Sequence, residues 1–166
     1  MKLQKQVYED LNKVFDFDCE PTQKFKTYTS AETAANHETD ASDDACWGKT
    51  NLMIPSKDIK HWFRLASEAL SKNRRTVIVT PFNPHYMYWF EYVHPFASSV
   101  VLYKQKFPIF QGYTKAAPKT ICLVVFDPKQ RKTSRSKTEL YGEYVDGKYV
   151  YMTIPLKVDK KYKETK

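Results

Sequence analysis

The residues Asn83, Pro84, His85 and Tyr86 place an amide and an aromatic ring shortly after the apolar run Thr76–Val79. An Asn side-chain oxygen can accept a hydrogen from an exocyclic amine, and an aromatic ring can stack on a base that has left its duplex. Asn-Pro is also a common opening for a tight turn. A four-residue pattern arises easily by chance, so we favour the structural turn over a base-binding site.

Two acidic residues, Asp18 and Glu20, come at the end of a short segment, Phe15–Asp18, that predicts a strand. A carboxylate at a strand end can bind the hydroxyls of a ribose, as in nucleoside cofactors. A solvated turn is the alternative interpretation of these two acids. The histidines and cysteines show no ligand spacing, so the sequence predicts no metal site and no disulfide framework.

The chain is basic, with 27 Lys and Arg against 19 Asp and Glu and a net charge of +8. This balance favours an anionic partner, and nucleic acid is the first candidate. Five cations fall within nine residues and suit contact with phosphates, with a solvated linker as the alternative. They are Lys129, Arg131, Lys132, Arg135 and Lys137. By contrast, Lys72, Arg74 and Arg75 end a predicted helix, where cations are favourable without any ligand.

Length and composition indicate one folded domain that works inside a cell. The chain of 166 residues is long enough to bury a core, and abundant aromatic residues argue against disorder. Three scattered cysteines favour a reducing compartment. The first fifteen residues lack the apolar segment of a signal peptide, and no apolar run could cross a bilayer. We therefore expect a soluble, cytoplasmic protein that does not bind membranes.

The elements that must position these groups alternate between strands and helices. Helical spacing predicts helices at Leu3–Val14 and Asp58–Leu70, and we expect a third helix in the aromatic-rich segment Tyr86–Phe96. The expected strands are Phe15–Asp18, Cys46–Ile54, Arg75–Pro81, Ser99–Tyr103 and Thr120–Phe126. This order predicts an α/β fold with a mainly parallel sheet, whose ligands bind beyond the carboxyl ends of the strands. Asp146-Gly147 further predicts a β-hairpin within Leu140–Leu156.

The order of several short motifs resembles the phage-type DNA N6-adenine methyltransferases over residues 8–126. The matching segments are Phe15–Asp18, Trp47–Lys49, Trp62 with Ala66, Thr76–Pro81 with Trp89-Phe90, and Ala117-Pro118 with Leu123–Phe126. The resemblance implies a methyltransferase-like, Rossmann-like domain over residues 1–128. Residues 129–166 would add a basic linker, a hairpin and a tail. The resemblance also implies a binding site for S-adenosylmethionine near Asp18 or Glu20.

The same resemblance places the catalytic Asn-Pro-Pro-Tyr motif at Met53-Ile54-Pro55-Ser56. Met53 offers no strong acceptor for an amine hydrogen, and Ser56 cannot stack on adenine. A shift of two residues would make Asn51 the acceptor but would still lack the prolines and the aromatic ring. The motif is therefore degenerate, and we expect neither methyl transfer nor a bound cofactor.

Three functions follow from these observations. The leading hypothesis is a catalytically degenerate methyltransferase-like protein that binds DNA or a DNA-associated host protein. The first alternative is an active S-adenosylmethionine-dependent DNA adenine methyltransferase, with Asn83 as the amine acceptor and Tyr86 stacked on the base. The second alternative is a pure protein-interaction module, such as a phage inhibitor of a host factor. A phage origin is implied by the resemblance alone.

Overall fold

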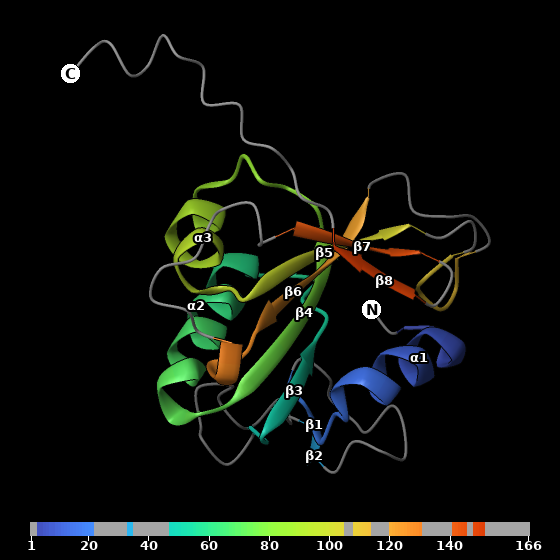
Figure 1. Ribbon diagram of the computed structural model, residues 1–166, viewed down its shortest axis with the longest axis horizontal. Coiled ribbons are helices and arrows are strands. Elements are labelled where there is room, and N and C mark those ends of the chain that lie inside the picture. The colour runs from blue at the N-terminus through green and yellow to red at the C-terminus, as the bar shows by residue number, and fades with distance from the viewer. Residues whose placement is uncertain are drawn as a thin grey trace, which may run out of the picture.

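The computed structural model describes residues 3–21, 33–34, 47–104, 108–113, 120–130, 141–145 and 148–151. They form an α/β fold around one eight-stranded sheet of order β2-β1-β3-β4-β6-β5-β7-β8 (Figure 1). The strands are β1 (Cys19–Glu20), β2 (Thr33–Ala34), β3 (Thr50–Met53), β4 (Arg75–Pro81), β5 (Ser99–Lys104), β6 (Ile121–Phe126), β7 (Tyr141–Val145) and β8 (Lys148–Tyr151).

The sheet is mixed, whereas the sequence predicted a mainly parallel one. Strands β1, β3 and β4 are parallel, but β6 lies between β4 and β5 and is antiparallel to both. A parallel return from β5 would need a crossover helix, and the segment between Lys104 and Ile121 carries no helical pattern. Strand β7 then pairs with β5 and forms the predicted hairpin with β8, in which Val145 and Lys148 are paired in the backbone register.

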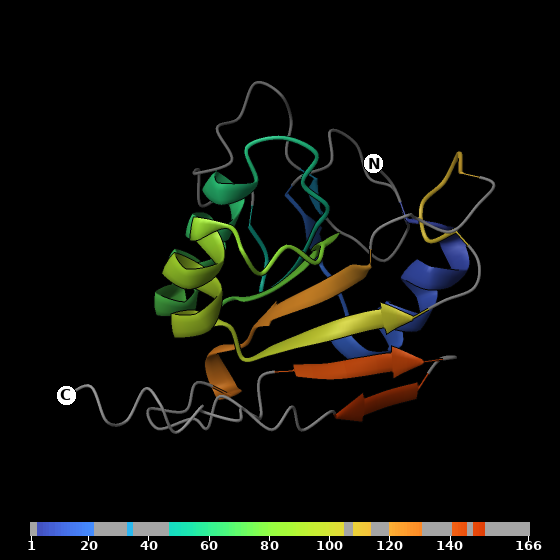
Figure 2. The same ribbon diagram turned by 90° about the horizontal axis from the view of Figure 1, so that it is seen from above.

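Helices cover both faces of the sheet (Figure 2). Helix α1 (Lys5–Phe15) packs on one face. Helix α2 (Ile59–Ala69), a π-helical segment (Trp89–Val93) and the short α3 (His94–Phe96) pack on the other. Among the described residues, the helices are all too short or too polar to cross a lipid bilayer.

The central strands are buried on both faces, so their side chains alternate between two cores. Val77 and Val79 of β4 face α1, whereas Ile78 faces α2. The six residues of β6 are all buried and alternate in the same way. This two-sided burial explains the continuous apolar runs that the sequence shows at both strands.

The segment after α1 differs from the prediction of a strand over Phe15–Asp18. Helix α1 continues to Phe15, and Asp16 takes the left-handed conformation (φ 55°) that ends it. The Phe17 amide then donates to the Asn12 side chain at 2.8 Å, and the strand begins only at Cys19. Asp18 therefore precedes β1 and lies at the amino edge of the sheet, not at a carboxyl end.

Candidate nucleic-acid interface

The carboxyl edge of the parallel strands is where the family resemblance places catalysis. Met53 ends β3, and it is fully buried with Ile54 (0% and 3% exposed), so this strand end presents no polar acceptor. Glu20 lies at the carboxyl end of β1, the edge expected for a ribose-binding acid, but it is 1% exposed. Ser56 is exposed. Met53 and Ile54 thus form apolar packing at this edge, and Ser56 lies at the surface.

Asn83 also follows a strand end, that of β4, and the tetrapeptide it begins forms a turn. The Tyr86 amide donates to the Asn83 carbonyl at 3.3 Å, and the Trp89 amide donates to the Tyr86 carbonyl at 3.0 Å. The turn thus leads directly into the π-helical segment. The half-exposed Tyr86 ring stacks on Tyr88, with centroids 5.7 Å apart and planes 14° apart.

The Tyr88 phenol is buried beneath this turn, and burial raises its pKa. The neighbouring Asn83 side chain acts in the opposite direction and lowers that pKa. The two groups do not meet in a well-aligned hydrogen bond, because the Tyr88 hydroxyl has no partner at hydrogen-bond geometry among the described residues. Asn83 is therefore a polar neighbour of a packed tyrosine, and its position at the carboxyl edge of β4 agrees with either interpretation of the motif.

Asp18 organises the amino edge of the sheet. Its carboxylate accepts hydrogen bonds from the Lys49 and Thr50 amides, each at 3.0 Å. Gly48 permits this approach, since a Cβ added there would lie 2.1 Å from Asp18 Oδ1. Both Asp18 oxygens are thus used to position the start of β3. The role of cofactor-binding acid stays a prediction for this residue, at an edge opposite to the expected one.

Asn51 is a structural residue at the same edge, although a shifted motif made it a candidate acceptor. It is 0% exposed. Its oxygen accepts from the Gly48 amide at 2.8 Å, and its nitrogen donates to the carbonyls of Gly48 (3.0 Å) and Arg75 (3.1 Å). These bonds tie the loop before β3 to the start of β4, so the amide is not available to a substrate.

A basic cleft of about 690 Å³ opens at this amino edge. Five cations line it, with two acids and the aromatic Trp47 among the other residues. The cations are Lys49, Lys72, Arg74, Arg75 and Lys129, and the acids are Asp18 and Asp127. Of the cations predicted to contact phosphate, Lys129 is exposed and lines the cleft. The others, Arg131, Lys132, Arg135 and Lys137, lie outside the described residues.

The sequence did not identify four of these cations as parts of one site. Three of them were assigned only to a helix end, and Lys49 was named only as part of the Trp47–Lys49 segment, not as a binding cation. Their positions at the beginnings of two strands could have predicted a shared site, because Thr50 of β3 pairs in parallel with Arg75 of β4. Residues that precede neighbouring parallel strands meet at one edge of the sheet.

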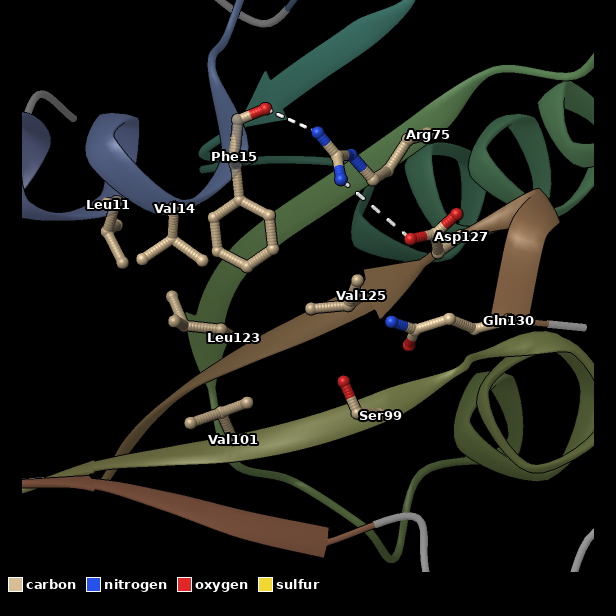
Figure 3. Close-up of a pocket in the computed structure, with 10 residues that line it drawn as sticks. All are labelled: Leu11, Val14, Phe15, Arg75, Ser99, Val101, Leu123, Val125, Asp127 and Gln130. Atoms are coloured by element: carbon tan, nitrogen blue, oxygen red, sulfur yellow. Dashed lines mark hydrogen bonds and ion pairs between the residues drawn. The ribbon is translucent and has the colours of Figure 1, made fainter. Parts of the chain in front are cut away.

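A smaller, mainly apolar pocket of about 310 Å³ lies between α1 and the sheet (Figure 3). Leu11, Val14 and Phe15 line it from the helix side, and valines and a leucine of β5 and β6 form its floor. Arg75 and Asp127 line both this pocket and the basic cleft. The two cavities therefore adjoin at this pair of residues.

In the described part of the chain, no group of three or more His, Cys, Asp or Glu side chains could hold a metal ion. Comparison of the chain with models of protein families, with curated proteins and with solved structures gave no match.

Proposed function

We propose that this chain is a catalytically degenerate relative of the phage-type DNA adenine methyltransferases and that it acts by binding DNA. The observation that carries the proposal is the basic cleft at the amino edge of the sheet. Its five cations come from the segment before β3, from the start of β4 and the segment before it, and from the turn after β6. Cations gathered from three separate segments into one concave surface are suited to a backbone of phosphates.

Two acids moderate this charge without cancelling it. Asp18 is engaged with two backbone amides, and Asp127 lies 3.8 Å from Arg75 (Nη1 to Oδ2) and accepts from the Lys129 amide at 2.9 Å. Among the described residues that line the cleft, five cations against two acids give a formal charge of +3 (5 − 2). The cleft thus keeps a net attraction for phosphate.

The chemistry of the carboxyl edge supports the degenerate form of the proposal. Methyl transfer to an amine needs an acceptor for the amine hydrogens, and Met53 and Ile54 are buried and apolar where the resemblance places it. The described end of β3 therefore offers no acceptor for the amine of a methyl-transfer substrate. Isothermal calorimetry with millimolar donor tests this: measurable binding, or methyl transfer lost in Asn83→Ala, would restore the active alternative.

The DNA-binding proposal is tested by neutralising one cation at a time. Lys49→Gln and Lys129→Gln each remove a cleft charge, and Lys57→Gln removes an exposed charge beyond the carboxyl end of β3. Binding of a labelled duplex is measured by fluorescence anisotropy across a salt series. Each phosphate contact contributes about −0.9 to the slope of log K against log salt concentration, where K is the association constant. If all five cations contact phosphates, the slope reaches its steepest value, about −4.5.

Each cleft variant should make this slope shallower by about one, whereas Lys57→Gln should leave it unchanged. Equal effects of the three variants would mean that net charge, not the cleft, attracts DNA. Absence of salt-dependent binding would refute the proposal and favour the protein-interaction module. That module predicts a host partner whose binding is unaffected by the same substitutions.

A further inference from the structure

The apolar pocket beside the basic cleft has the size and lining of a small-molecule site. Its volume of about 310 Å³ lies at the lower end of the range for such sites, roughly 300–1,000 Å³. Its floor is formed by Val101, Leu123 and Val125, and the half-buried Phe15 adds an aromatic wall. A ligand that entered it would need a flat or compact apolar body.

Polar groups collect at the end of the pocket that meets the cleft. Ser99, Asp127 and Gln130 line it there with Arg75, as Figure 3 shows. Together they offer hydroxyl, carboxylate, amide and guanidinium groups, so both donors and acceptors are present. A group with a polar edge and an apolar face, such as a nucleobase, matches this combination.

Arg75 connects the two cavities. One of its terminal nitrogens donates to the Phe15 carbonyl at the end of α1, and the guanidinium carbon lies 5.7 Å from the centroid of the Phe15 ring. Its Nε is buried and makes no hydrogen bond to any described residue. Arg75 thus lies at the boundary where a phosphate in the cleft and a base in the pocket would be joined.

We infer that the pocket receives an unpaired base of a DNA strand whose phosphates lie in the basic cleft. The inference rests on the proposed function and gives it a substrate class: single-stranded or locally unpaired DNA. A duplex hides its bases inside and would present only its sugars and phosphates to the pocket. A single strand displays each base beside its phosphate, and such strands are bound by basic grooves with apolar or aromatic platforms.

Val14 provides the test because it lines the pocket yet is 62% exposed, so it can be changed without disturbing the core. Met87 is the matched control, since it is 66% exposed on the helical layer over the opposite face. Each residue is replaced in turn by Glu and by Lys. The probes are one labelled single strand of mixed sequence and the duplex of the same sequence, both measured by anisotropy at about 0.1 M salt.

The wild type should bind the single strand about tenfold more tightly than the duplex. Val14→Glu and Val14→Lys should both reduce this ratio toward one, because either side chain obstructs the pocket whatever its charge. Met87→Glu and Met87→Lys should leave the ratio unchanged. Opposite effects of Val14→Glu and Val14→Lys would indicate electrostatics alone and overturn the inference.

Tight binding of both probes with a wild-type ratio near one would also overturn the inference while leaving the proposed function intact. Failure to bind either probe would overturn both. These outcomes separate the failure of the pocket from the failure of the cleft.

Discussion

Replacing Asn51 by Ala should destabilise the fold because its side chain makes three buried hydrogen bonds. Two of them join Asn51 to Gly48, in the loop before β3, and the third joins it to Arg75, which begins β4. A buried hydrogen bond contributes about 1 kcal/mol net, so their loss amounts to about 3 kcal/mol. For a chain of this size, that loss lowers the melting temperature by roughly 6–12 °C.

The assay is urea denaturation followed by circular dichroism, with the midpoint and the slope fitted separately. Asn83→Ala is the matched control, because the Asn83 side chain is only partly buried and its contact with Tyr88 is not a well-aligned hydrogen bond. It should change the free energy of unfolding by about 0.5 kcal/mol or less. Asn51→Asp should be at least as damaging as Asn51→Ala, since a carboxylate cannot donate to the two carbonyls.

A loss below about 1 kcal/mol in Asn51→Ala would refute the reasoning, because the bonds to Gly48 and Arg75 could then not be stabilising the loop before β3 and its link to β4.

Two further predictions concern Gly48 and Cys122. Gly48→Ala should lower the free energy of unfolding by about 2 kcal/mol, because the added Cβ would displace the Asp18 carboxylate from two backbone amides. The same substitution should have a much smaller effect in an Asp18→Ala background, which a double-mutant cycle by urea denaturation measures. Burial raises the pKa of the Cys122 thiol well above its usual value near 9. The native thiol therefore stays protonated while the unfolded one ionises, so stability is kept below about pH 9 and lost above it, by up to about 1.4 kcal/mol per pH unit. Cys122→Ala should show a shallower alkaline loss than the wild type in unfolding series run from pH 8 to about pH 10.5, and equal slopes would contradict this assignment.

Most elements of the fold followed from the sequence because their apolar patterns are strong. Helix α2 and strand β4 agree with their predicted ranges within one residue, since each has a clear apolar pattern and a distinct end. The direction of β6 did not follow, because strand direction depends on the connection and not on the pattern within the strand. Asp18 was assigned to the wrong edge for a related reason, since a two-residue strand such as β1 carries no periodicity.

The candidate site was harder to predict than the fold. Lys129 was found because it begins a local run of cations, whereas Lys49 stands alone in the sequence and joins the others only through parallel pairing. The apolar pocket had no sequence signal. Its residues read as ordinary core positions of α1, β5 and β6, and only the partial cover that α1 gives the sheet leaves space between them.

The position of β6 has a consequence for the order in which this chain can fold. Strands β4 and β5 are neighbours in sequence order but not in the sheet, because β6 lies between them and pairs with both. During synthesis, β4 and β5 are therefore both made before their common partner β6. Until then, the edges that will pair with β6 can pair with other chains. We expect the sheet to close in a late, cooperative step after residue 126 leaves the ribosome. Chains truncated before β6 should aggregate more readily than chains truncated after it.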